Sequence, residues 1–344
     1  RFPGLLPFAI YLAAAGIAAL GAGFFTVMAF MAPITLLICE EAKMDKLVGA
    51  VAVNCGALSG ANFMTSGSGI IFRGLMDEAG LSDVSFNYSA VIFVTSVIFS
   101  LLLIAAFRYI PKSNRNIGKG VTFEKPEPFT KQQKTNLRLI ILMIALVLIF
   151  PILHIVLPGN ALIANINGKI DVGLVAIIFS VIALLLKLAP QKEVIAKIPW
   201  NTIIMICGVG MLIGVAIEAG TIDMLSTWAG SNLPVWVVPI AFSIIGAIMS
   251  FFSSTLGVVC PALFPLVPAL AAGTGINPMI LFTCIVVGSQ SSAISPFFSG
   301  GSLVLGSCAT EEERKAMFPR LLFLAVPASV LAATAYNFFL SLFL

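Results

Sequence analysis

The apolar runs of this chain are interrupted in a way that plain membrane helices are not. One span takes about 20 apolar residues, but the stretch 236–272 is longer and carries Ser253-Ser254-Thr255 near its middle. The stretch 4–38 is also too long and carries Gly21-Ala22-Gly23. Two further apolar stretches are expected to begin as helices and then continue into tracts rich in Ser and Gly: 47–75 and 278–306. Backbone at such breaks has no water partner in lipid, so it must be buried in protein or line a cavity.

Composition assigns the class of protein. Of the 344 residues, 59% are hydrophobic and 10% are charged, whereas soluble domains average about 25% charged residues. The chain is therefore expected to be an all-α polytopic membrane protein. Besides the interrupted stretches it contains plain candidate spans, at 88–107, 138–157, 171–188, 200–217 and 319–343. The net charge of +4 is typical of cytoplasmic loops rather than of a nucleic-acid-binding surface.

The distribution of Lys and Arg predicts on which side of the membrane each loop lies. These residues gather in the polar stretch 111–137, in the loop 188–199 and around 314–320, so these segments are expected to be cytoplasmic. The loops that contain at most one such residue are expected outside: 76–87, 158–170 and 218–235. With these sides fixed, 236–272 must enter and leave on the outer side, and 4–38 on the cytoplasmic side. Both are predicted to be re-entrant hairpins.

The two interrupted regions also repeat. Shifting the numbering by 232 places Gly21 on Ser253 and Asp45 on Asn277, and one inserted residue then places Asn62 on Ser295. The same order of elements in opposite orientations indicates an inverted-topology transporter. The prediction divides the chain into three parts. The first repeat covers 1–110, the cytoplasmic linker covers 111–137, and the second repeat covers 138–344. The second repeat begins with three helices over 138–217. Since the first repeat lacks those three helices, about 100 residues are expected to precede it.

The breaks carry the expected binding site. A broken helix leaves free N–H groups at one new end, which attract carboxylates, and free C=O groups at the other, which suit a cation. The residues expected to bind substrate are Ser253, Ser254, Thr255, Gly21, Ala22, Gly23, Asn62 and Ser295. Those expected to bind Na⁺ are Ser59, Ser66, Gly67, Ser68, Ser292, Ser299 and Gly300. Any one such residue is more often a helix-packing residue, but clusters at matching places in two repeats favour ligands. Ser250, one turn before the Ser-Ser-Thr break, is expected to lie outside the site.

Three stretches resemble a known family: "SGANFMTSGSGII" (59–71), "SFFSSTLGVVCPALFPLVP" (250–268) and "IPWNTIIMICGVGMLIGVAIEAG" (198–220). They are similar to bacterial malonate/dicarboxylate carriers of the divalent anion/sodium symporter family, in the ion transporter superfamily. The resemblance implies a homodimer in the bacterial inner membrane, each protomer having a scaffold part and a mobile transport part. Family members carry Ser-Asn-Thr at both tips, where this chain has Ser253-Ser254-Thr255 and Gly21-Ala22-Gly23.

The expected function is cation-coupled symport of a small organic anion, a dicarboxylate such as malonate, malate or succinate. Asp, Glu, Lys, Arg and His are all missing from the four breaks, which favours Na⁺ over a proton as coupling ion. No cofactor is expected. The alternatives are a proton-coupled or inorganic-anion carrier of the same superfamily, or a non-transporting membrane component. An enzyme is disfavoured because no metalloprotease, Ser–His or nucleotide-binding motif occurs.

Overall fold

The computed structural model describes residues 3–109, 128–157, 160–167, 172–196 and 234–343, with isolated residues between 204 and 228. All regular structure in this described part is helical, which confirms the all-α class. Five helical stretches there are long and apolar enough to cross a membrane. The chain forms two compact units, residues 1–121 with 201–344, and residues 122–200.

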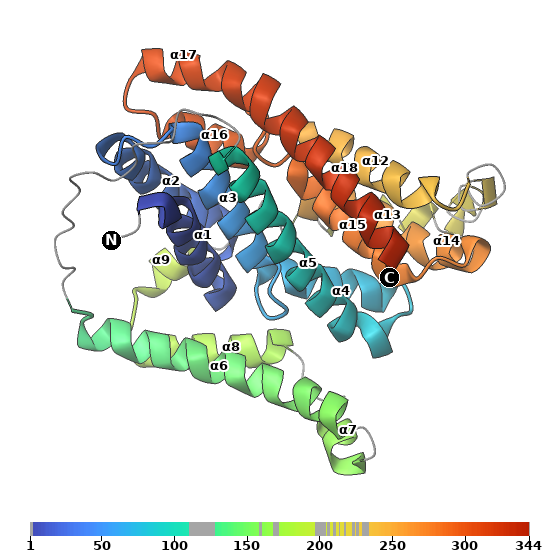
Figure 1. Ribbon diagram of the computed structural model, residues 1–344. Helices are drawn as coiled ribbons and strands as arrows, with labels where there is room; N and C mark the ends of the chain where they lie inside the picture. Colours follow the sequence, from blue (N-terminus) through green and yellow to red (C-terminus); the bar gives the residue numbers. More distant parts are fainter. Residues whose placement is uncertain are drawn as a thin grey trace. The chain divides into compact units, whose positions relative to one another are not determined.

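The first unit begins with two helices that pack on a third (Figure 1). Helix α1 (Leu6–Ile17) continues through a π-helical turn (Ala18–Ala22) into α2 (Gly23–Glu41), and both lie along α3 (Lys46–Ala61). The backbone of Tyr11 lies beside Gly56, and that of Ala15 lies beside Gly60. Helices α1 and α3 therefore run in the same direction. Because α2 reaches α3 through the tight turn 42–45, it runs the opposite way, and α1 and α2 form a hairpin.

A second hairpin is built in the same manner. Its first arm is α12 (Val237–Phe252), and its second arm is assembled from η4 (Thr255–Val259), α13 (Cys260–Leu263), η5 (Phe264–Leu266) and α14 (Val267–Thr274). The last three pieces each have a proline in their first turn: Pro261, Pro265 and Pro268. Proline has no N–H to donate and clashes with the preceding turn of a helix. This explains why the second arm is segmented rather than one straight helix.

Helix α12 lies along α15 (Pro278–Ser291), as α1 lies along α3. The backbone of Ser243 lies beside Gly288, and the Ser292 hydroxyl donates to the Ala247 carbonyl at 2.8 Å. Residue numbers rise together along both helices, so they are parallel. Gly275, whose φ is +73°, turns the chain from α14 into α15, and the two arms of this hairpin are antiparallel too.

The repeat is visible in individual contacts. Gly56 beside Tyr11 and Gly288 beside Ser243 are the same contact at a shift of 232. The Asp45 side chain caps α3 by accepting from Leu47 N, and Asn277 caps α15 by accepting from Met279 N, at 2.9 and 3.0 Å.

The same shift continues beyond the point where the sequence comparison placed an inserted residue. Gly69 packs on the carbonyl of Phe63, and Gly301 packs on that of Ser295. The residue that matches Ser66 is accordingly Phe298, and both are extended residues that start a helix. The prediction of one inserted residue between the repeats is therefore wrong. The sequence comparison had matched Ser and Gly residues that do not occupy equivalent backbone positions.

Five further helices of the first unit lie within residues 67–109 and 299–343. They are α4 (Gly67–Glu78), α5 (Ser82–Tyr109), α16 (Ser299–Gly306), α17 (Glu311–Arg320) and α18 (Val326–Phe343). A π-helical turn, Leu321–Ala325, joins α17 to α18. The closing helix was expected to begin at residue 319, but helix already begins at Glu311. Thr310 accepts a hydrogen bond from Glu313 N at 3.1 Å, and three glutamates occupy the first turn, both of which favour a helix start.

The second unit contains α6 (Lys131–Val156), α7 (Ala161–Asn167), α8 (Val172–Leu185) and α9 (Gln191–Ala196). The sequence predicts an irregular linker over 111–137. This prediction is wrong for residues 131–137, which are helical. Thr130 and Gln133 form reciprocal hydrogen bonds of 2.9 and 3.2 Å, which cap α6. Linker residues 111–127, and much of the expected span 200–217, lie outside the described residues.

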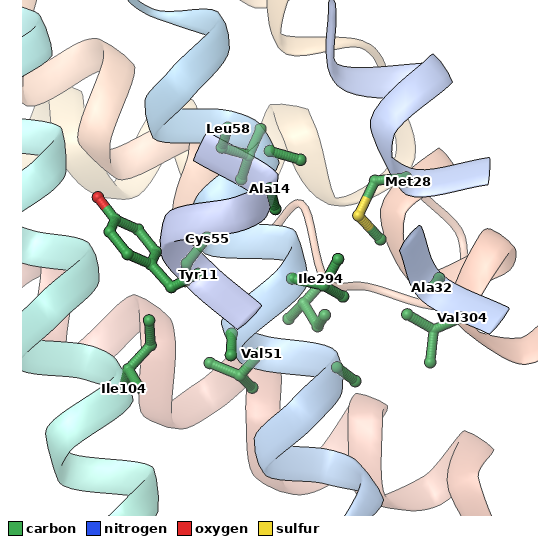
Figure 2. Packing of buried hydrophobic residues seen from close by; sticks show 14 of the residues in the cluster. Tyr11, Ala14, Met28, Ala32, Val51, Cys55, Leu58, Ile104, Ile294 and Val304 are labelled. Carbon is green, nitrogen blue, oxygen red and sulfur yellow. The ribbon is translucent and has the colours of Figure 1, made fainter. Parts of the chain in front are cut away.

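The hydrophobic core of the first unit holds the first hairpin against α3. Tyr11 and Ala14 of α1 lie against the helix that carries Cys55 and Leu58, as Figure 2 shows. Gly56 and Gly60 lie where a side chain would overlap the α1 backbone, so these glycines permit the close approach. A second core joins α4 to the second hairpin and α15. The breaks of both repeats are thus positioned by packed helices rather than by free loops.

Candidate functional site

Among residues 3–109 and 234–343, four breaks interrupt the helices. Tip 1 is 18–23, at the turn of the first hairpin, and connector 1 is 62–66, between α3 and α4. Tip 2 is 253–255, at the turn of the second hairpin, and connector 2 is 292–298, between α15 and α16. At each break one helix ends and another begins.

Tip 1 is shaped by its two glycines. Gly21 has φ +99° and Gly23 has φ +72°, a region that residues with a Cβ rarely adopt. No atom lies within 4 Å of a Cβ built on either glycine, so the backbone conformation rather than crowding requires glycine. Gly21 is exposed, and Ala22 and Gly23 are half-buried. Tip 1 therefore offers backbone groups and no side-chain donor.

Tip 2 offers hydroxyls in three different states. Ser253 donates to its own helix at the Met249 carbonyl, 2.5 Å away. Ser254 is half-buried and accepts from Gly257 N at 3.0 Å, which leaves its own O–H free to donate. Thr255 is buried, and its Oγ1 lies 2.7 Å from the Ser250 Oγ. Ser250, which was expected to lie outside the site, is fully buried and bonds to Thr255, so Ser250→Ala is not an inert control.

Connector 1 is tied both to tip 1 and to the other repeat. Ser66 donates to the Ala18 carbonyl at 2.7 Å. Asn62 is fully buried, and its amide exchanges two hydrogen bonds with the amide of Gln290, at 2.9 and 2.8 Å. Asn62 is therefore committed to a contact between the repeats.

Connector 2 contacts both hairpins through aromatic rings. The Phe298 ring centroid lies 6.1 Å from that of Phe24, at the start of α2, and the Phe297 centroid lies 5.7 Å from that of Phe251 beside tip 2. Buried Ser295 accepts from Phe297 N at 3.2 Å, so its O–H is free to donate. Together with the contacts of connector 1, these contacts link all four breaks into one connected region.

The residues expected to bind Na⁺ divide into two groups. Three of them mediate contacts between helices. Ser59 donates to the Tyr11 hydroxyl at 3.0 Å, Ser292 donates to the Ala247 carbonyl, and Gly300 packs against Asn54 and the Ala293 carbonyl. The others stand at helix starts: Ser66 and Gly67 with buried Ser68 at α4, and half-buried Ser299 at α16.

The electrostatics of the region come from helix ends. Four helical segments begin at the breaks: α2 at Gly23, α4 at Gly67, η4 at Thr255 and α16 at Ser299. N–H groups in a first turn have no acceptor within their own helix and carry partial positive charge. The ends of α3, α12 and α15 present carbonyl groups at the same breaks. Such a region can attract an anion and a cation without a charged side chain.

The sequence analysis did not identify two residues that bond to the candidate site residues, Gln290 and Tyr11. Gln290 pairs with Asn62, and Tyr11 accepts the bond of Ser59. An amide within an apolar helix is a signal that sequence alone could have supplied for Gln290. Tyr11 gives no such signal, because a tyrosine in a membrane helix has many uses.

An apolar helical bundle with two hairpins and two interrupted helices in matching positions defines a membrane transport protein. The sequence pattern of the citrate transporter (CitMHS) family matches residues 2–341. The match spans nearly the whole chain, which therefore belongs to this family. No curated protein sequence matches the chain.

Family membership confirms several expectations at a coarse level. The protein is an integral, multi-pass secondary transporter of citrate or other organic anions, and it is not an enzyme. The family lies within the superfamily that the resemblance indicated. The closer likeness to malonate carriers stays a prediction.

Proposed function

We propose that this protein is a Na⁺-coupled symporter that carries an organic anion with two or three carboxylates, citrate or a dicarboxylate such as malonate, malate or succinate. The proposal rests above all on four helix starts that meet in one connected region with no charged side chain in the tips or connectors. The family name supports citrate. The dicarboxylates follow from the likeness of the Ser253-Ser254-Thr255 tip to dicarboxylate carriers.

The anion contact is best assigned to Ser254, which is half-buried. Its hydroxyl accepts a backbone N–H, so it has a hydrogen to donate to a carboxylate. Ser295 also accepts a backbone N–H, but it is fully buried and is assigned a contact only in a state that exposes connector 2. The first-turn N–H groups that follow Ser254 add further donors. By contrast, Ser253 and Ser66 already donate to carbonyl groups, and their oxygens retain lone pairs that suit a cation.

The residue types at the breaks support Na⁺ as the coupling ion. A buried Asp, Glu or His is the usual proton carrier in a transporter, and none occurs in tips 1 and 2 or in connectors 1 and 2. Carbonyl and hydroxyl oxygens are the ligands that hard cations prefer. A co-bound cation would also balance part of the substrate's negative charge.

The test is uptake into proteoliposomes that contain the purified protein. Labelled citrate, succinate, malate and malonate are each offered with NaCl or choline chloride outside. We expect uptake that requires Na⁺ and changes little when a protonophore collapses an imposed proton gradient. Full uptake in choline chloride that stops with the protonophore would identify a proton-coupled carrier instead. Uptake of none of these anions, with inorganic anions carried, would reject the proposed substrate class.

We also propose that the protein acts as a homodimer in the bacterial inner membrane, as the resemblance implies. Native mass spectrometry of the detergent-purified protein would give the mass of two chains. A single-chain mass across the detergents tested would reject the dimer.

A further inference from the structure

A surface cavity of about 560 Å³ lies within the second unit, at one end of α6 and α8. The two helices lie side by side (Figure 1). The lining residues come from the first turns of α6, the last turns of α8 and the segment that leads into α9. Ligand pockets measure roughly 300–1,000 Å³, so this cavity is large enough for a small ligand or for the polar head of a larger one.

The wall that α6 contributes offers hydrogen-bond donors. Thr130, Gln132, Gln133 and Asn136 line it. Thr130 N donates to the Gln133 amide oxygen, and Gln133 N donates to the Thr130 hydroxyl, so the Gln133 NH₂ and the Thr130 O–H remain available to donate. The side chains of Gln132 and Asn136 form no hydrogen bond with any residue that the structure describes. Four neighbouring side chains can therefore donate to one acceptor-rich ligand.

The rest of the lining is largely apolar. It includes Leu184 near the end of α8, and Leu188 and Val194 beyond it. The exposed side chains of Leu185 and Leu186 continue this apolar surface away from the cavity. A polar wall beside an apolar one suits an amphipathic ligand better than a small inorganic anion, which would leave the apolar wall in contact with water.

The side chains around the cavity are strongly positive. Five cations lie on the segments that line it, against a single carboxylate, Glu193. All five are exposed, and none forms an ion pair with a residue that the structure describes. Such a concentration of positive charge attracts an anion. The five are Lys131, Lys134, Arg138, Lys187 and Lys192.

The cavity lies where both helices pass from polar to apolar sequence. Residues 131–136 of α6 are all polar and residues 139–153 are all apolar, while the apolar α8 is followed by Lys187. In a membrane protein such a boundary lies at the level of the lipid headgroups. The Lys and Arg pattern predicts the cytoplasmic side for this end, where the leaflet carries anionic lipids.

We propose that this cavity binds the headgroup of an anionic glycerophospholipid. Its phosphodiester accepts hydrogen bonds from the amides of Gln132 and Asn136, and the surrounding lysines balance its charge. Its acyl chains lie along the apolar surface that begins at Leu184. A zwitterionic lipid fits less well, because it brings its own cation into a positive region. The bound lipid would hold the ends of α6 and α8 at the headgroup level.

The test is a titration of the delipidated full chain in detergent with phosphatidylglycerol, followed by native mass spectrometry to give the Kd of the tightest lipid site. Gln132→Leu/Asn136→Leu should weaken that site at least about tenfold, because bonds to a charged group are lost. Lys131→Gln/Lys134→Gln should weaken it about fivefold for each lysine. Neither variant removes a member of the Thr130–Gln133 cap, so α6 should be retained. The control is Lys315→Gln, an exposed cation on α17, which should leave the Kd unchanged.

Further arms separate the possible occupants. Phosphatidylcholine with the same acyl chains should bind at least about tenfold more weakly than phosphatidylglycerol, and equal affinity would overturn the proposal. Inorganic phosphate in large excess should not displace the lipid; if it does, the cavity binds free anions and the lipid assignment is wrong. A loss confined to the lysine variant would indicate diffuse attraction to charge rather than a site. Wild-type affinity in both double variants would mean that another part of the protein covers the cavity, and would also overturn it.

Discussion

Asn62 and Gln290 form a reciprocal pair of amide hydrogen bonds, 2.9 and 2.8 Å long, that joins the two repeats. Asn62 follows the last residue of α3, and Gln290 lies one residue before the end of α15. The helix interruptions of both repeats are therefore fixed to each other by two buried side chains. Each amide satisfies the other, and neither is free to bind substrate as well without breaking the pair.

The amide pair predicts a strong coupling in stability. Gln290→Leu leaves the Asn62 amide buried and unpaired, which should cost about 1–3 kcal/mol. The double variant Asn62→Leu/Gln290→Leu should cost less than the sum of the single variants. Thermal unfolding in detergent measures all three. As a control, Ser180→Ala on exposed α8 removes a bond within its own helix and should change stability by less than about 0.5 kcal/mol. Additive losses would show that the two amides act independently.

The close approach of α12 and α15 predicts that Gly288 tolerates no side chain. A Cβ at residue 288 would overlap the backbone of Ser243, so Gly288→Ala should destabilise the protein by about 1–3 kcal/mol. Gly74→Ala in α4 is the matched control, because no atom lies within 4 Å of its added Cβ. The control should be neutral or stabilising by up to about 1 kcal/mol. Equal Tm values for the two variants would contradict the described helix packing.

Asp45 has two roles that substitution can separate. Its Oδ1 caps α3, and its Oδ2 lies 2.6 Å from an Arg320 nitrogen of α17. Asp45→Asn keeps the cap, as Asn277 does in the second repeat. Because Arg320 is 41% exposed, loss of the ion pair should cost only about 0.2–1 kcal/mol. Asp45→Ala should lose a further 0.5–2 kcal/mol or so with the cap. Unfolding curves for the two variants that coincide would argue against the capping role.

Ser254 is the side chain on which the substrate proposal depends most. Loss of one hydrogen bond to a carboxylate should cost about 1.5–3 kcal/mol, which is roughly tenfold to more than a hundredfold in affinity. Ser254→Ala should therefore weaken citrate or dicarboxylate binding in a calorimetric assay while Tm changes little. Ser341→Ala on α18 removes a hydroxyl that bonds to its own helix and serves as control. Wild-type affinity in Ser254→Ala would place the anion elsewhere.

The second hairpin predicts a membrane topology. Single cysteines at positions 235 and 273 are introduced after the six native cysteines are replaced by alanine. If the hairpin is re-entrant, a membrane-impermeant thiol reagent should label both positions from the outer side of intact cells. Labelling from opposite sides would mean that 236–272 spans the membrane, and the inverted repeat would then be wrong.

Much of the fold could be predicted because lipid restricts the choices. Long apolar stretches with central Gly or Ser-Ser-Thr can only be interrupted helices, and the structure places interruptions at Gly21 and Ser253. The first residues of helices that begin outside the apolar runs were harder to predict. The closing helix was expected to begin at 319, where the apolar run begins, but α17 begins at Glu311 with Thr310 as its cap.

The positions of the helix interruptions were predicted better than the state of each hydroxyl within them. The sequence located all four interruptions, but it could not say which hydroxyls remain available to a ligand. Ser254 and Ser295 keep a free O–H, whereas Ser66 and Ser292 donate to carbonyls of other helices. Those partners lie 48 and 45 residues away in the chain, so only tertiary packing brings them together.

The amino-acid sequence by itself determined the class of protein and the positions of the helix breaks. These features depend on local chemistry, because apolar length, proline, glycine and clustered hydroxyls act within a few residues of the chain. Only the tertiary structure decided that Asn62 pairs with Gln290 and that Thr255 bonds to Ser250. Each of these depends on which faces of separate helices meet, and periodicity in an almost uniformly apolar sequence does not distinguish those faces.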